Sequence, residues 1–231
     1  MNVIDKFKAD FENTLNRSEG LIKNIRSKAF EKFISGKFPT RKDEYWKYSD
    51  PSAILNLDLN FNDSGNFEDE NYDIILCNGK IVKTLTELKT GTIADGLEKG
   101  YITKELFKEE NNAFLNLNNA FAINGCYLIL DSGGKKDIKV LNLIDNDGRN
   151  QAIYPKFVII SGKNSDSTIF EEIRVRGNGT NFVNSVTDII IEDGANLEHI
   201  ILDDFAKDTY NISNICVKQK KDSNFRSHNF S

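Results

Sequence analysis

The sequence contains few of the side chains that usually build active sites and metal centres. Its 231 residues include only two histidines, His199 and His228, and three cysteines, Cys77, Cys126 and Cys216. The cysteines lie far apart, are odd in number and form no C-x-x-C pair, so neither a disulfide framework nor a zinc clamp is indicated. We expect the three cysteines to be buried thiols.

Long apolar runs and an excess of positive charge are also missing. The longest runs, such as 157–160, are short against the roughly 20 residues that cross a bilayer, and the N-terminus lacks the apolar region of a secretory signal. We therefore expect a cytoplasmic protein without membrane contact. Thirty basic against 35 acidic residues leave a net charge of -5, which provides no general attraction to phosphate backbones, so nucleic acid is not an expected partner.

Nucleotide-binding signatures are absent as well. Gly36–Lys37, Gly79–Lys80 and Gly162–Lys163 are followed by Phe, Ile and Asn, so the hydroxyl that holds magnesium in a P-loop ATPase is missing. The G-x-G in Arg176–Gly179 has no third glycine and no helix after it, which favours a turn over a dinucleotide site.

The N-terminal part shows helical periodicity. Apolar residues recur every four positions in two sets, Val3, Phe7, Phe11, Leu15 and Leu21, Ile25, Ala29, Phe33. The second helix should end near Gly36, and a short third helix should open at Asp50–Pro51. Residues 56–71 form a polar connector, the Asn78–Gly79 turn predicts a β-hairpin over 72–83, and 105–121 is again helical in pattern.

Beyond Asn124, β-branched runs follow one another at 10–15-residue spacing with Gly, Asn or Asp between them. A sandwich, a barrel or a β-solenoid would fit this spacing. The tight Gly194–Asn196 corner between two strands favours stacked coils, hence a parallel β-helix. We predict a mainly β fold with two parts, an N-terminal helical region over 1–115 with the hairpin, and a β-helix portion over 116–231.

The last residues, 223–231, still alternate like a strand, and no closing helix follows. A β-helix that is open at this end exposes backbone donors and acceptors, which invites pairing with another chain. We therefore expect self-association through the open end, or disorder near 220–231.

Several side chains are weak candidates for chemistry. Asp203–Asp204 could serve as a carboxylate pair of a carbohydrate-cleaving β-helix enzyme, but adjacent strand residues point to opposite faces. His199, next to Glu198, could ligate iron or zinc, and His228 with Cys216 could hold a metal or cluster. A solvated turn is the better interpretation of Asp203–Asp204 and a structural role that of His199, and a metal at His228 and Cys216 is disfavoured. We assign no catalytic, cofactor-binding or metal-ligating residue.

The loop after the second helix is the densest local signal. Aromatic and charged residues alternate over Arg41–Tyr48, a composition that could bind nucleic acid by stacking and charge. Asp43 and Glu44 interrupt the basic run, so an anchoring role for Trp46 is preferred.

The segment Phe38–Asp50 (FPTRKDEYWKYSD) resembles the F-P-T-R-[KR]-x-E-x-W-[KR]-Y-[ST] signature of the SufD family, subunits of the bacterial SUF iron–sulfur cluster assembly machine. Ile75–Lys80, Leu117–Leu128 and Ile189–Ile201 are similar to further SufD segments in the same order. SufB proteins lack this arrangement around the Pro-Thr-Arg loop, so SufD fits better.

The resemblance implies a right-handed parallel β-helix, of the single-stranded solenoid type, preceded by a helical region. It also implies a non-catalytic scaffold that pairs with a SufB-like paralogue and with a SufC-like ABC ATPase, and on whose assembly iron–sulfur clusters form. The chain resembles only the first part of SufD proteins. By this resemblance we expect the C-terminal helical domain that docks SufC to be absent from residues 1–231, and we expect no cofactor bound by this portion. The alternative is a β-helix carbohydrate-active enzyme, a polysaccharide lyase or hydrolase.

Overall fold

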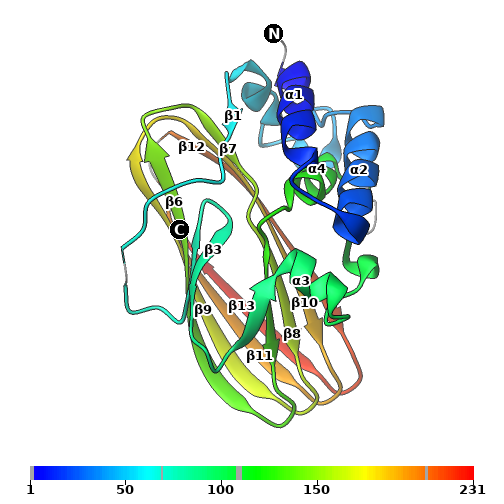
Figure 1. Ribbon diagram of the computed structural model, residues 1–231, viewed down its shortest axis with the longest axis vertical. Coiled ribbons are helices and arrows are strands. Elements are labelled where there is room, and N and C mark those ends of the chain that lie inside the picture. Colours follow the sequence, from blue (N-terminus) through cyan, green and yellow to red (C-terminus); the bar gives the residue numbers. More distant parts are fainter. Residues whose placement is uncertain (1–2, 69, 108–110, 206–207) are drawn as a thin grey trace.

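The computed structural model describes residues 3–68, 70–107, 111–205 and 208–231. A small group of helices packs at one end of a flattened β-solenoid (Figure 1). The helices are α1 (Val3–Leu15), α2 (Gly20–Ser35), α3 (Ile93–Glu98) and α4 (Ala113–Phe121), with 3-10 helices η1 (Glu44–Trp46), η2 (Pro51–Asn56) and η3 (Lys104–Phe107).

The solenoid consists of two sheets. Sheet A contains β1 (Asn60–Phe61), β4 (Lys89–Thr92), β5 (Cys126–Leu130), β7 (Gln151–Ile153), β8 (Lys156–Ser161), β10 (Asn181–Ile191) and β12 (Thr209–Gln219). Sheet B contains β2 (Ile74–Cys77), β3 (Lys80–Thr84), β6 (Lys135–Asp147), β9 (Asp166–Asn178), β11 (Asn196–Asp204) and β13 (Asn224–Phe230). From β5 onward the chain passes repeatedly from sheet A to sheet B, and the strands stacked in successive coils pair in parallel. The predicted parallel β-helix behind N-terminal helices is confirmed.

The coils repeat at a nearly constant spacing. In sheet B, Lys135 pairs with Asp166, Asp166 with Asn196, and Asn196 with Asn224, which are spacings of 31, 30 and 28 residues. The corner before each of these strands contains one residue with positive φ: Gly133 (67°), Asn164 (57°), Gly194 (69°) and Asp222 (56°). Glycine, asparagine and aspartate tolerate this left-handed conformation best. The coils therefore share a backbone conformation at their corners rather than one residue type.

The predicted hairpin is confirmed as β2 and β3. Asn78 (φ 49°) and Gly79 (φ 78°) both have positive φ, as a two-residue type I′ turn requires. β2 also pairs in parallel with β6, and β4 pairs antiparallel with β5, so strands from the first hundred residues extend both sheets. The division of the chain at residue 115 stays a prediction.

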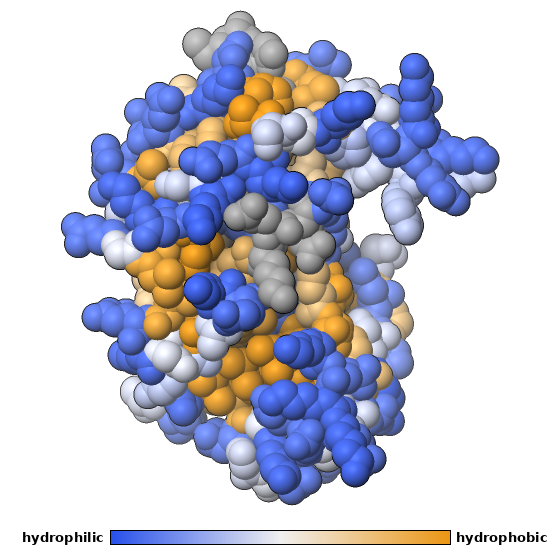
Figure 2. Space-filling model, turned by 90° about the vertical axis from the view of Figure 1, so that its right-hand side faces the viewer, coloured by the Kyte–Doolittle hydropathy of each residue, from blue (hydrophilic) through white to orange (hydrophobic). Residues whose placement is uncertain are grey.

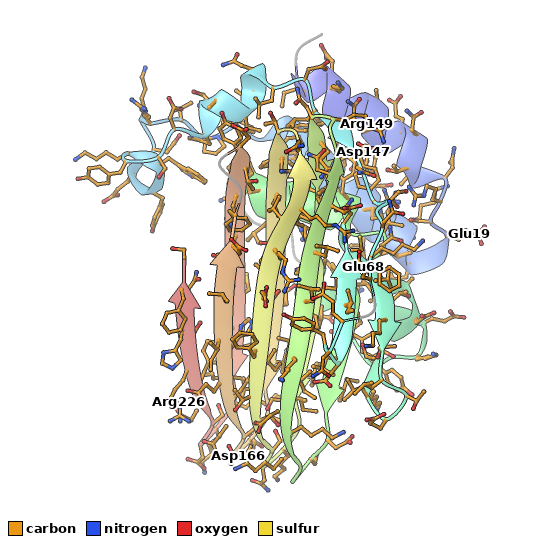
Figure 3. The ribbon with its side chains drawn as sticks, turned by 90° about the vertical axis from the view of Figure 1, so that its left-hand side faces the viewer. Glu19, Glu68, Asp147, Arg149, Asp166 and Arg226 are labelled. Atoms are coloured by element: carbon orange, nitrogen blue, oxygen red, sulfur yellow. The ribbon has the colours of Figure 1, made fainter. Side chains whose placement is uncertain are left out.

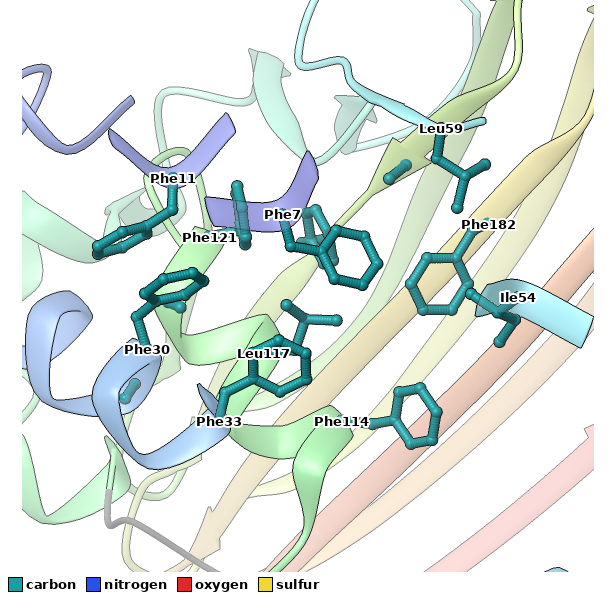
Figure 4. Packing of buried hydrophobic residues seen from close by; sticks show 14 residues of the cluster. Phe7, Phe11, Phe30, Phe33, Ile54, Leu59, Phe114, Leu117, Phe121 and Phe182 are labelled. Carbon is teal, nitrogen blue, oxygen red and sulfur yellow. The ribbon is translucent and has the colours of Figure 1, made fainter. Parts of the chain in front are cut away.

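Aromatic side chains hold the helices on sheet A (Figure 4). Phe11 of α1 stacks on Phe30 of α2 with ring centroids 4.0 Å apart, and Phe121 of α4 stacks on Tyr154 at 4.4 Å. Tyr154 also meets Phe182 of β10 edge-on. Burial of each such side chain contributes about 1.5–3 kcal/mol, so this cluster fixes the helices against the solenoid.

The helix boundaries follow the sequence signals with two differences. α2 ends before Gly36, as expected, and Asp50 caps η2 by accepting from the Ser52 amide at 3.0 Å. Leu21 is 46% exposed because Ile22 occupies the inner face of the first turn of α2. The helix predicted over 105–121 is shorter than expected, since η3 and α4 are separate elements and residues 108–110 lie outside the described chain.

A fully buried arginine joins α1, α2 and α4. Arg26 donates from Nε to the Ala120 carbonyl at 2.7 Å, and its terminal nitrogens donate to the Thr14 carbonyl at 3.1 Å and to the Ser18 hydroxyl at 2.5 Å. Its guanidinium lies 5.5 Å from the centre of the Phe11 ring. Burial lowers the pKa of Arg26 to about 10, so the group stays charged at neutral pH.

Candidate functional site

The interior of the solenoid contains a polar layer between two apolar layers. Alternate strand residues point inward, and near the middle of β6, β9, β10 and β11 these are polar: Asn142, Glu171, Ser185, Thr187 and His199. The layer runs diagonally across sheet B, because Glu171 pairs with Val140 and Ile201, and His199 pairs with Ile169. Apolar residues lie on either side along the same strands, Ile138, Val140, Ile169, Ile189 and Leu197 in one cluster and Ile144, Ile173, Val183 and Ile201 in the other. The polar layer was not predicted as a unit, because its members are spread over 58 residues of sequence.

His199 is a structural residue of this layer. Its Nε2 lies 2.9 Å from Oε2 of Glu171, and the Asn142 amide donates to the other oxygen of Glu171 at 3.3 Å. Among the described residues, His199 Nδ1 and Asn142 Oδ1 have no hydrogen-bond partner. The neighbouring Glu198 points to the opposite face of β11 and therefore takes no part in the surroundings of His199.

The two adjacent carboxylates at the end of β11 do not form a pair. Asp203 points into the solenoid and is partly buried, whereas Asp204 is exposed on the outer face. Burial and the charge of Glu171 raise the pKa of Asp203. The arrangement lacks the two facing carboxyl groups that glycoside cleavage requires.

His228 and Cys216 lie on different sheets. The Nε2 of His228, on β13 of sheet B, is 3.2 Å from Glu198 Oε1 on the outer face. Cys216, on β12 of sheet A, is half-buried and lines a cavity of about 260 Å³ with Lys156 and Asp188. The structure therefore does not bring the two residues together as a ligand set. Within the part of the chain that the structure describes, no group of three or more His, Cys, Asp or Glu side chains could hold a metal ion.

The other two cysteines are buried, as predicted. Cys77 is 1% exposed and Cys126 is fully buried. Burial raises the pKa of Cys77 to about 11 and that of Cys126 to about 12. Both therefore remain protonated, unreactive thiols at neutral pH.

Sequence reasoning missed a buried ion pair below α4. Lys156 Nζ lies 2.5 Å from Asp188 Oδ2, donates to Asn119 Oδ1 at 3.0 Å, and sits 5.1 Å from the centre of the Phe107 ring. Lys156 and Asp188 are single charges within apolar strand runs, which is the signal that could have revealed them. The pair joins α4 to β8 and β10 and fixes their relative position.

The loop after α2 is anchored as the sequence indicated. Trp46 packs against Phe114 of α4 with ring centroids 5.2 Å apart, and Phe38 meets the same ring edge-on at 5.3 Å. Tyr45 and Tyr48 contribute nothing to this packing, since they are 97% and 91% exposed. Trp46 therefore anchors the loop, whereas its neighbours Tyr45 and Tyr48 are exposed to solvent.

The outermost strands, β12 and β13, form an exposed edge. β13 lies at the margin of sheet B (Figure 3), and the Asn224 amide donates to the Ala195 carbonyl at 2.9 Å. Because alternate residues of a parallel strand bond to opposite sides, the backbone groups of Phe225, Ser227 and Asn229 face outward. Several apolar side chains are exposed on these strands and next to them: Leu202, Tyr210, Ile215, Val217 and Phe230. We define these strands and side chains as the exposed edge.

Comparison with known families identifies two regions of the chain. Residues 2–95 match the SufBD protein N-terminal region, and residues 143–231 match the SufBD core domain of SUF system FeS cluster assembly. Comparison with curated proteins finds no match. No helix among the described residues is long and apolar enough to span a bilayer. The two matched regions correspond to the N-terminal helices with the hairpin and to the later coils of the solenoid, and the chain is therefore a member of the SufB/SufD family of SUF iron–sulfur cluster assembly proteins.

Proposed function

We propose that the chain is a non-catalytic scaffold subunit of the SUF complex, of the SufD type, which pairs with a SufB-like paralogue and a SufC-like ABC ATPase in the cytoplasm. The role in iron–sulfur cluster assembly follows from the family. The SufD type is supported by the Phe38–Asp50 motif, and the scaffold role by membership of an iron–sulfur cluster assembly family. The cluster is cargo of the assembled complex, and we assign no residue of this chain to it.

The proposed pairing with the SufB-like subunit rests on the exposed edge. The outward backbone groups of β13 can accept a further parallel or antiparallel strand, and the apolar side chains beside them would be covered at the same time. Sheet extension of this kind explains how two solenoid proteins join end to end. A second copy of the chain can occupy the same edge, so we also propose self-association when the SufB-like subunit is absent.

Co-purification tests this proposal directly. The chain of residues 1–231, the SufB-like subunit and the SufC-like subunit are mixed, and the mass of the complex is measured by size-exclusion chromatography with light scattering. The Ser227→Pro variant removes one outward N–H without touching a hydrogen bond to β11, and Ser227→Ala is its matched control. We expect Ser227→Pro to weaken pairing at least tenfold and Ser227→Ala to leave it unchanged.

Two results would contradict the proposal. One is that no complex forms with either subunit. The other is that Ser227→Pro and Ser227→Ala bind equally well while both retain the circular dichroism spectrum and melting curve of the unmodified protein.

A further inference from the structure

The segment between α2 and η2 projects from the body of the molecule. Figure 2 shows this projection at the upper right of the face in view, and Figure 3 shows it extending away from the sheets from the other side. It consists of consecutive tight turns around η1, with the Asp43 amide bonded to the Thr40 carbonyl at 3.0 Å and the Trp46 amide to the Asp43 carbonyl at 2.8 Å. We call residues 40–49 the projecting turn.

The side chains of the projecting turn divide between faces at a period of three, as in a 3-10 helix. Asp43 and Trp46 belong to the inner face. The carboxylate of Asp43 accepts from the Thr40 amide at 2.7 Å, and Trp46 packs on Phe114. An ion pair of 3.1 Å between Arg41 and Asp50 joins the two ends. The turn is thus held in one shape before any partner binds.

Lys42, Tyr45 and Tyr48 follow the same period and form the outer face. The two tyrosines are far more exposed than any other large hydrophobic residue described, the next being Phe230 at 56%. Lys47 lies over the ring of Tyr48, 5.4 Å from its centre. Exposed aromatic rings on a rigid support add nothing to the fold, whereas Tyr is among the residues that contribute most to protein interfaces.

The charge around the projecting turn is opposite to that of the whole chain. Four lysines at and beside the turn, Lys32, Lys37, Lys42 and Lys47, have no ion pair among the described residues, whereas the charge of Arg41 is neutralised by Asp50. With the carboxylates of Asp43 and Glu44 in the turn, these residues keep an excess of two positive charges. The chain as a whole has a net charge of -5. A local basic surface on an acidic protein is complementary to carboxylates of a partner, while the overall charge opposes a polyphosphate.

A groove of about 780 Å³ lies beside the turn. Its lining includes Lys32, Lys37, Pro39, Tyr45, Trp46 and Asn214. Tyr45 therefore belongs both to the projection and to the wall of the groove, so that a partner could contact the two continuously. The convex aromatic tip fits an apolar pocket of a folded protein better than it fits a small molecule. The groove beside it, whose wall holds Lys32 and Lys37 against one carboxylate, Asp43, fits carboxylates at the border of such a pocket.

We propose that the projecting turn and the groove beside it are a docking site for a second protein of the SUF system, one that presents an apolar pocket bordered by carboxylates. The inference rests on the proposed function. It adds a contact surface at the helical end of the molecule, on elements separate from β12 and β13, which form the exposed edge.

Binding measurements with purified SUF subunits of the same organism test the inference. Affinities of the chain are measured by biolayer interferometry at several salt concentrations, for the unmodified protein and the Tyr45→Ala/Tyr48→Ala variant. Tyr101→Ala, a substitution of a 40% exposed tyrosine elsewhere, is the matched control. We expect the double variant to bind one subunit at least tenfold more weakly and the control to bind as the unmodified protein does.

Charge reversal provides a second, independent variant. Lys42→Glu/Lys47→Glu should slow association with the same subunit and reduce its salt dependence, whereas Lys80→Glu/Lys99→Glu, at exposed lysines elsewhere, should not. The inference is overturned if all variants bind every subunit equally, or if the tyrosine variant loses only affinity for a single-stranded oligonucleotide. If the unmodified chain binds no subunit, the proposed function fails and the docking site fails with it.

Discussion

The polar layer inside the solenoid makes a quantitative prediction about stability. Glu171 is the centre of the layer, because it accepts from Asn142 and contacts His199, and all three side chains are at most 3% exposed. Glu171→Leu replaces the carboxylate with an apolar group of similar size. The substitution leaves the Nε2 of His199 and the Nδ2 of Asn142 without the partner each has in the unmodified protein.

The expected cost follows from the two orphaned groups. Each buried polar group without a partner costs about 1–3 kcal/mol, and Glu171→Leu leaves two such groups. We therefore expect Glu171→Leu to lower the free energy of unfolding by about 3 kcal/mol. His199→Leu should cost a similar amount, because it leaves the Glu171 carboxylate in the interior. The double variant should cost at least 1 kcal/mol less than the sum, because residues in contact are coupled.

Urea unfolding followed by far-ultraviolet circular dichroism at pH 7 measures these free energies. The reasoning is refuted if the two single substitutions add within about 0.5 kcal/mol, the limit expected for independent sites. It is also refuted if Glu171→Leu leaves the free energy of unfolding unchanged.

Three further predictions concern other parts of the fold. Gly177→Ala should prevent stable folding, since a Cβ there would lie 1.9 Å from the Asn146 carbonyl oxygen. Gly148 also has positive φ but has open space around it, so Gly148→Ala should lower the free energy of unfolding by only about 1–2 kcal/mol in the same urea assay. Arg26→Met should lower the free energy of unfolding by about 2–4 kcal/mol, since it removes the hydrogen bonds that join three helices; a loss below 0.5 kcal/mol would count against this role. Asp203→Asn should raise the urea midpoint at pH 7, because the pKa of this carboxyl is raised in the folded state and its ionisation therefore opposes folding. The gain in midpoint should shrink as the pH is lowered toward 4, where the carboxyl of the unmodified protein becomes protonated. A gain that is constant with pH would contradict this.

Local signals in the sequence predicted local structure well. The Asn78–Gly79 turn, the glycine after α2 and the Asp50–Pro51 helix start each depend on a few adjacent residues, and each is found where expected. The corner at Gly194 also indicated stacked coils. The other corners were less visible, because Asn164 and Asp222 adopt the same left-handed conformation without being glycine.

Contacts between coils could not be predicted from adjacency. His199 and Glu171 are 28 residues apart, and only the register of β9 against β11 brings them together. In the sequence the carboxylate next to His199 is Glu198, but neighbours on a strand point to opposite faces. Lys156 and Asp188 escaped notice for the same reason, since their contact depends on the pairing of β8 with β10.

Hydrogen exchange of the chain with and without the SufB-like subunit tests the central claim most directly. Because their N–H groups face outward, the amides of Phe225, Ser227 and Asn229 should exchange fast in the isolated chain at concentrations that prevent self-association. They should become strongly protected in the complex, while amides of β9, already paired on both sides, should change little. A complex that forms without protection of β13 would show that the exposed edge is not the scaffold contact.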